Sequence, residues 1–160
     1  MSDAKVNVRK VRPGDGDAVC ELIEALLAYE EIGPMTDGAK ERLVADMFAE
    51  DPRFDTFVAE SAGRIVGYAI VYETYSTMRG RPRLYIEDIF VLPEKRGQSA
   101  GYALFREVVR HAAERGCAQI EWQVLTWNQL AIDFYERLGG KRESEWYTFR
   151  LSEDAMRHIV

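Results

Sequence analysis

The chain of 160 residues has the usual length of a single domain, which buries roughly 68–70% of the surface that its unfolded chain exposes. Apolar residues make up 47% and charged residues 30% of the sequence, a globular composition that argues against disorder. The net charge of −6 repels phosphate backbones and argues against nonspecific binding to nucleic acids. A cationic substrate such as an amine is compatible with that charge.

Membrane and metal-binding classes are disfavoured as well. The apolar runs fall short of the ~20 residues that span a bilayer, and residues 1–7 have no apolar run typical of a signal peptide. The spacing of Cys20 and Cys117, and of His111 and His158, matches no metal site. We therefore expect a cytoplasmic protein with reduced thiols, no metal, and both histidines as ordinary surface or helix residues.

Apolar periodicity predicts one strand and two helices in the first fifty residues. Alternating apolar and polar residues over 6–11 favour a half-buried strand. Apolar residues spaced at three and four predict an amphipathic helix from about residue 18 to Tyr29 or Glu30. Thr36 or Asp37 is a suitable cap for a second helix.

The middle of the chain predicts a hairpin followed by a buried strand. Residues 54–60 and 64–75 favour two strands joined by a tight turn, and the second is apolar enough to be central. Residues 84–92 predict another buried strand, which the carboxylates of Glu87 and Asp88 interrupt.

The last third predicts a helix ended by Gly116, a strand over 119–125, and a helix capped by Asn128. Two short strands between residues 141 and 151 and a short terminal helix complete the expected order. The whole order implies an α+β fold with a mixed, mostly antiparallel sheet flanked by helices and one crossover pair. We expect residues 1–160 to form a single domain.

Two local patterns indicate chemistry. After Arg96, a segment with the small residues Gly97, Ser99, Ala100 and Gly101 opens a helix directly after a strand. Such a helix start suits an anion such as a pyrophosphate; a helix start that needs small residues for packing is equally compatible. In an extended strand Glu87 and Asp88 point to opposite faces, so at least one enters an apolar region, where burial raises the pKa of a carboxylate towards that of a general base. A structural salt bridge remains the alternative.

The helix from Asn128 to Gly140 carries Tyr135, which is either a core residue or a donor of a phenolic proton. This helix and residues 91–102 resemble the GNAT superfamily of acetyl-CoA-dependent N-acetyltransferases, and the resemblance extends over nearly the whole chain. It is most similar to the diamine (spermidine/spermine) acetyltransferase branch, on the blocks Ala28-Tyr29-Glu30, Leu84 to Val91, and Trp127-Asn128 with its spacing to Tyr135.

The resemblance implies a role for each residue that matches a family motif. Glu87 corresponds to a base that takes a proton from the acceptor amine through water, and Tyr135 to the acid that protonates the departing CoA thiolate. The residues implied in binding acetyl-CoA are Ile89, Phe90, Val91, Arg96, Gly97, Gln98, Ser99, Ala100, Gly101, Tyr102 and Asn128. The residues implied in binding the acceptor are Tyr29, Glu30, Asp88 and Trp146.

The loop departs from the family pattern at Ser99, which replaces the first glycine. Serine keeps the backbone donor, and we expect binding of CoA to survive, weakened if this position needs a positive φ.

The leading interpretation is direct transfer of an acetyl group to a primary amine of a small cationic acceptor, with polyamines or diamines first. Lysine-like amino acids, thialysine among them, are the nearest alternative, and a protein lysine is a third. A non-catalytic module that binds acetyl-CoA is the alternative of a different class. The resemblance also implies a homodimer, whereas the expectation of no nucleic-acid and no membrane partner follows from the charge and the short apolar runs.

Overall fold

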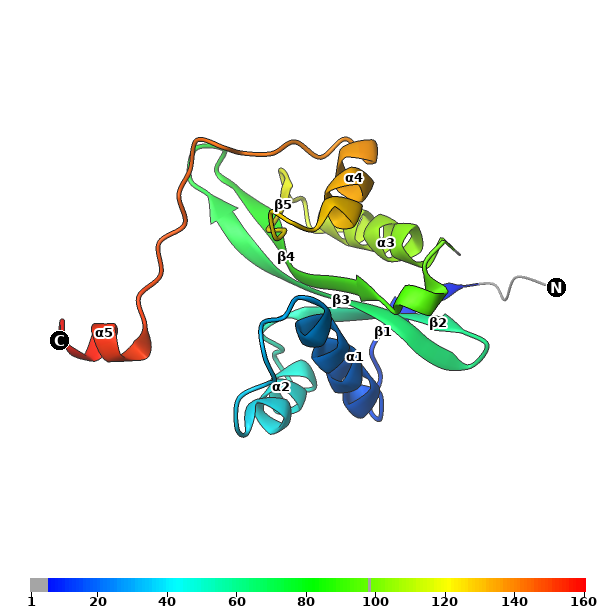
Figure 1. Ribbon diagram of the computed structural model, residues 1–160. Coiled ribbons are helices and arrows are strands. Elements are labelled where there is room, and N and C mark those ends of the chain that lie inside the picture. Colours follow the sequence, from blue (N-terminus) through cyan, green and yellow to red (C-terminus); the bar gives the residue numbers. More distant parts are fainter. Residues whose placement is uncertain (1–5, 98) are drawn as a thin grey trace. The chain divides into compact units, whose positions relative to one another are not determined.

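The computed structural model describes residues 6–97 and 99–160 of the chain (Figure 1). Its internal contacts divide the chain into two units, Met1–Gln123 and Val124–Val160. The first unit holds the sheet and the three long helices α1 (Gly16–Tyr29), α2 (Ala39–Met47) and α3 (Ala100–Glu114). The helices of the second unit are α4 (Gln129–Arg137) and α5 (Glu153–Arg157). No helix in the described part of the chain is long and apolar enough to cross a membrane.

The sheet has five strands in the order β1-β2-β3-β4-β5, which is also their order in the sequence. They are β1 (Asn7–Lys10), β2 (Asp55–Ser61), β3 (Arg64–Ser76), β4 (Arg81–Val91) and β5 (Ile120–Trp122). The first four pair antiparallel, and β4 pairs parallel with β5 across the α3 connection. The predicted hairpin, central strand and single crossover pair are therefore confirmed.

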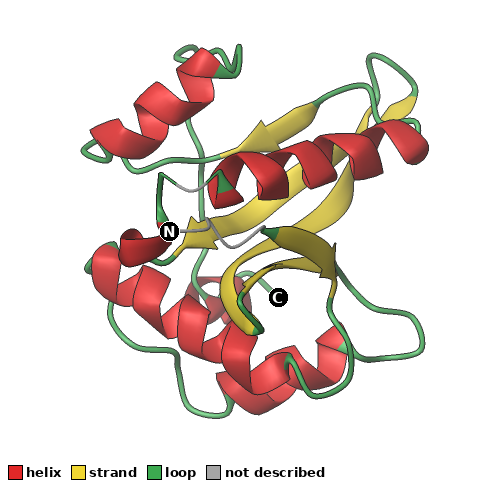
Figure 2. Cartoon of the chain, turned by 90° about the vertical axis from the view of Figure 1, so that its right-hand side faces the viewer, coloured by secondary structure: helices red, strands yellow, loops and turns green. Residues whose placement is uncertain are grey.

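Helices cover both faces of this sheet, with α1 and α2 on one face and α3 on the other (Figures 1 and 2). On the α3 face the packing is tight, since Leu104 and Val108 are 0% exposed. A Cβ at Gly67 on β3 would lie 2.7 Å from the Phe90 carbonyl oxygen and 3.2 Å from Leu104 Cδ1. The absence of a side chain at Gly67 therefore avoids a collision with the neighbouring strand β4 and leaves room for Leu104 of α3.

A β-bulge interrupts β4 at the two carboxylates. Val71 of β3 lies opposite Ile86, and the next residue back, Ile70, lies opposite Asp88. Glu87 is thus an extra residue with no counterpart on β3. Bulges of this kind bend the strand and redirect its side chains, and they are frequent beside active sites.

Several predicted details of the local structure are wrong. The second helix is preceded by Gly38, not by Thr36 or Asp37; Gly38 has φ 69°, a left-handed conformation that glycine adopts without strain, and its carbonyl accepts from the Arg42 amide. The fifth strand covers only Ile120–Trp122 of the expected 119–125. The prediction that His111 is a helix residue is confirmed; its ring is nearly buried and its Nε2 is 2.9 Å from an Asp55 carboxylate oxygen.

The two closing strands predicted between residues 141 and 151 are also wrong. This segment contains no strand in the described structure, and all of its residues are exposed. Alternating side chains favour a strand, but a strand forms only where a neighbouring backbone supplies the ladder. The short terminal helix predicted after this segment is confirmed as α5.

Candidate active site

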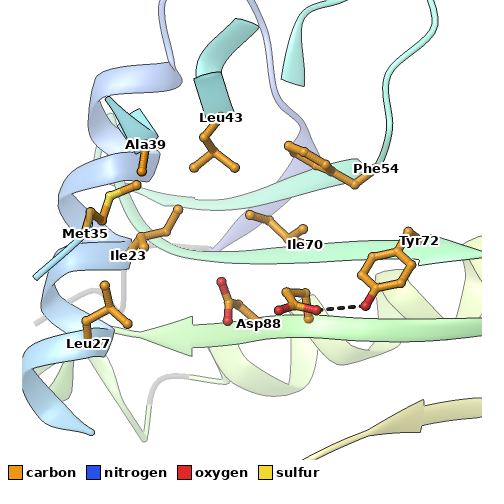
Figure 3. Close-up of a pocket in the computed structure, with 10 residues that line it drawn as sticks. Ile23, Leu27, Met35, Ala39, Leu43, Phe54, Ile70, Tyr72 and Asp88 are labelled. Carbon is orange, nitrogen blue, oxygen red and sulfur yellow. Dashed lines mark hydrogen bonds between the residues drawn. The ribbon is translucent and has the colours of Figure 1, made fainter. Parts of the chain in front are cut away.

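A cavity of about 400 Å³ lies on the α1–α2 face of the sheet (Figure 3). Most of its wall is apolar and comes from α1, α2, the segments that flank α2, and β3. The apolar residues are Ile23, Leu27, Met35, Ala39, Leu43, Phe54 and Ile70. The polar residues of the lining are Tyr72 on β3 and the carboxylates Glu87 and Asp88 on β4.

Both carboxylates line this one cavity, which corrects the expectation that they point to opposite faces. In a regular strand adjacent side chains do alternate. The bulge at Glu87 breaks that alternation, so Glu87 and its neighbour Asp88 meet in the same space. Two negative charges thereby stand at the sheet end of an apolar cavity.

Glu87 is the exposed member of the pair. The hydroxyl of Tyr72 donates a hydrogen bond of 2.9 Å to Glu87 Oε2, drawn as the dashed line in Figure 3. Burial, together with this bond to a carboxylate, raises the pKa of Tyr72 to about 12. Tyr72 therefore stays protonated near neutral pH and fixes one oxygen of Glu87.

Asp88 is the more buried member, and its side chain points into the cavity (Figure 3). Burial raises the pKa of Asp88 to about 6, with smaller contributions in the same direction from the charges of Glu87 and Glu30. The hydroxyl of Tyr68 opposes this shift by donating a hydrogen bond of 3.1 Å to Asp88 Oδ2. The raised pKa that the sequence predicted for one of the two carboxylates is thus found at Asp88.

The end of α1 brings two predicted acceptor residues into this region. Tyr29 is the last residue of the helix, and burial raises the pKa of Glu30, which follows it. The guanidinium of Arg96 lies 4.8 Å from the centroid of the Tyr29 ring and 5.5 Å from that of Phe90. Arg96 Nε also donates to the Val91 carbonyl at 3.0 Å, so Arg96 connects α1 with the end of β4.

The predicted pyrophosphate loop runs from a short 3₁₀ turn, η1 (Pro93–Lys95), to the start of α3. Ser99 precedes the helix with φ 64°, so this position does adopt the left-handed conformation that favours glycine. Its side chain makes no capping hydrogen bond, and the first turn of α3 holds no acidic residue. Backbone amides at an uncapped helix start suit an anion such as a pyrophosphate. Gln98 lies outside the described residues.

The second unit holds Asn128, Tyr135 and Trp146. Asn128 caps α4, as predicted, through a bond of 3.3 Å from the Ala131 amide to its Oδ1. Tyr135 is partly buried on α4, where its ring packs edge-on against Phe134 at 5.5 Å. Trp146 is 80% exposed in the segment 141–151. Their roles in catalysis and binding stay predictions.

Sequence reasoning missed the two tyrosines that bond the carboxylates, and it missed the apolar wall. A signal for the tyrosines was present, because Tyr68 and Tyr72 lie in a nearly continuous apolar strand. A buried phenol needs a hydrogen-bond acceptor. The carboxylates of the adjacent predicted strand were the available acceptors. The apolar wall of the cavity could not be predicted in this way, because its residues come from four separate segments of the sequence.

Comparison with known proteins gives a consistent result. Residues 21–140 match the model of the acetyltransferase (GNAT) family. The chain is 36% identical over 168 aligned positions to a thialysine N-epsilon-acetyltransferase of Sus scrofa, covering 98% of both chains. It is 27% identical to a spermidine/spermine N(1)-acetyltransferase-like protein of Homo sapiens, covering 93% of this chain and 23% of that protein. Among solved structures, an integron cassette protein of V. cholerae has a similar fold, with a TM-score of 0.79, 19% identity and 96% of both chains covered.

Proposed function

The chain belongs to the acetyltransferase (GNAT) family, and on that premise we propose that it transfers the acetyl group of acetyl-CoA to a primary amine of a small cationic acceptor. The observation that carries this proposal is the pair Glu87 and Asp88 at the sheet end of an apolar cavity. An ammonium group with an alkyl chain complements both parts, because carboxylates bind the charge and apolar side chains bury the methylenes.

An acceptor of the thialysine or lysine type fits this cavity best. Apart from the two carboxylates, none of the described residues that line the cavity is charged. The second ammonium of a polyamine, buried against that wall, would lack a counter-charge at a large cost in free energy, whereas the α-ammonium of thialysine or lysine is accompanied by its own carboxylate. The relative with 36% identity is named for thialysine.

Polyamines, predicted first from the sequence, are the second candidate acceptors. Glu30 favours them, because its carboxylate is close enough to Asp88 to influence the pKa of that residue and offers a charge to a distal ammonium. The relative with 27% identity is named for spermidine and spermine.

The proposed chemistry starts from a protonated amine, whose pKa of about 10.4 keeps it non-nucleophilic near neutral pH. Asp88 holds the ammonium, and Glu87, exposed to solvent, takes a proton from it through water. The freed amine nitrogen bonds to the thioester carbonyl carbon of acetyl-CoA as the carbon–sulfur bond breaks. Tyr135 then gives its phenolic proton to the departing thiolate, and the new amide nitrogen loses its extra proton to solvent, from which the phenol of Tyr135 is restored. No covalent intermediate with the protein is needed.

For acetyl-CoA itself we propose the uncapped start of α3 as the pyrophosphate site. The amides of Ala100, Gly101 and Tyr102 precede the first intrahelical donor, Ala103, which bonds the Ser99 carbonyl. The remaining predicted contacts are residues 89–91 and 96–98 and Asn128. They rest on the resemblance of these positions to the family motif.

We also propose that residues 1–160 act as one domain of a cytoplasmic homodimer. Tyr147 and Phe149 are each 91% exposed and Leu151 is 62% exposed, within a segment that forms no strand in the described structure. A second copy of the chain that covers these side chains would remove their apolar surface from water. Light scattering on a sizing column tests this, with twice the mass of one chain expected and the mass of one chain contradicting it.

The function is tested by release of the CoA thiol from acetyl-CoA with purified protein. The acceptors are thialysine, lysine, spermidine, spermine and putrescine, against a blank without amine. We expect turnover with at least one acceptor, fastest with thialysine, and its loss in the Tyr135→Phe variant, which still binds CoA. Release equal to the blank with every amine would contradict the proposal and favour a protein lysine or a non-catalytic role.

A further inference from the structure

We infer that Tyr68 is a positioning residue of the acceptor site, which holds the Asp88 carboxylate towards the cavity as the anion that receives the acceptor's ammonium group. This inference rests on the proposed function. Tyr68 does not line the cavity, so it acts only through Asp88.

The register of the sheet brings the two side chains together. Tyr68 lies opposite Phe90, and Ile70 lies opposite Asp88, which makes Tyr68 and Asp88 diagonal neighbours across β3 and β4. The side chain of Tyr68 is 0% exposed, so its hydroxyl has no route to solvent water. Its bond of 3.1 Å to Oδ2 therefore fixes one oxygen of Asp88, while the carboxylate as a whole lines the cavity.

A structural role alone explains this pair poorly. Phenylalanine would fill the same buried position without a polar atom, and a buried carboxylate is costly unless its charge is compensated. One hydrogen bond from a phenol compensates it only in part. An ammonium group in the cavity supplies the missing positive charge, and Asp88 faces that cavity because it lies opposite Ile70, which lines it too.

The groups around Asp88 determine how it titrates. Glu87 on β4 and Glu30 after α1 add negative charge and, with burial, raise its pKa, whereas Tyr68 on β3 lowers it. Tyr72, also on β3, bonds Glu87 instead. The α2 side chains that line the cavity are uncharged. Removing the Tyr68 hydroxyl therefore raises the pKa of Asp88 further, and the anion is lost at a higher pH.

The test is the pH dependence of kcat/KM for the wild type and the Tyr68→Phe variant with the best acceptor. We expect the kcat/KM of the wild type to fall on the acidic side of the profile with a midpoint near pH 6. The corresponding midpoint of the variant should lie about one pH unit higher. The variant then loses about fivefold at pH 6 and less than about twofold at pH 8.5. An equal loss at every pH would overturn the inference, because it would indicate a structural role alone.

Tyr72→Phe is the matched control, since it removes one phenolic hydroxyl from the same strand at the other carboxylate. Its acidic limb stays at the wild-type position if Asp88 is the titrating group. A limb that moves with Tyr72→Phe and not with Tyr68→Phe would assign the titration to Glu87 and overturn the inference.

A second readout is independent of turnover. In ¹³C-aspartate-labelled protein, the Asp88 carboxyl resonance, assigned by its absence in Asp88→Asn, titrates at higher pH in Tyr68→Phe than in the wild type. Absence of turnover in the wild type contradicts the proposed function, whereas an unshifted titration contradicts the role of Tyr68.

Discussion

The two faces of the sheet differ although they share β3 and β4. On the α3 face Leu104 and Val108 are completely buried, and Gly67 leaves room for Leu104 beside β4. On the α1–α2 face the same strands border a cavity of about 400 Å³, with the bulged carboxylates at its sheet end. One face is therefore closely packed, whereas the other borders a cavity that two carboxylates line. Shortening a buried side chain on the α3 face should therefore cost more stability than shortening one on the α1–α2 face.

The largest effect on stability is expected from Leu104→Ala on the α3 face. Removing a fully buried leucine side chain lowers the free energy of unfolding by about 3 kcal/mol. Its matched control is Leu43→Ala, which shortens a half-buried side chain of the cavity wall and costs about 1 kcal/mol. Urea unfolding measures both. Equal losses would contradict the distinction between a packed and an open face.

Asp88→Asn is expected to stabilise the fold while it impairs the reaction. Because burial raises the pKa of Asp88 to about 6, the ionised carboxylate destabilises the folded chain. The contribution of Asp88 to the free energy of unfolding of the wild type therefore falls as the pH rises from 4 through 6. The asparagine has no charge to bury and gains about 2 kcal/mol relative to wild type at pH 8, with little difference at pH 4. Thermal unfolding at both values measures this. A variant less stable than wild type at pH 8 would contradict it.

The smallest effect concerns the start of α3. Ser99 has φ 64°, and glycine relieves that strain, so Ser99→Gly raises the free energy of unfolding by about 1 kcal/mol and slightly tightens acetyl-CoA binding. Ser99→Ala is the control, because it removes the hydroxyl but keeps the strain. Calorimetry and unfolding curves measure the two effects. If Ser99→Ala raised the free energy of unfolding as much as Ser99→Gly, the gain would not come from relieving the positive φ, which would contradict this prediction.

Much of the fold was predictable because its signals are local. Apolar spacing in α1 reports a buried helix face, and Asn128 is a cap whose side chain bonds an amide three residues on. The nearly continuous apolar run of β3 indicates a strand that is covered on both faces. The family motifs are also continuous in sequence, which is why the resemblance identified the family.

The features that were not predictable depend on contacts between distant segments. The bulge at Glu87 is a property of the pairing between β3 and β4, and no residue of β4 alone specifies it. The cavity depends on how α1 and α2 cover the sheet. The segment 141–151 has the alternation of a strand, but it forms no strand in the described part of the chain. Side-chain type predicted the chemistry of Glu87 and Asp88, whereas their common orientation required the fold.

The central claim is that the two carboxylates beside the bulge bind and deprotonate an acceptor amine. The most direct measurement is the steady-state release of CoA with thialysine by the Glu87→Gln, Asp88→Asn double variant, together with its affinity for acetyl-CoA by calorimetry. We predict that kcat/KM falls by at least about 100-fold while the Kd for acetyl-CoA changes less than about twofold. Turnover within tenfold of the wild type would contradict the claim.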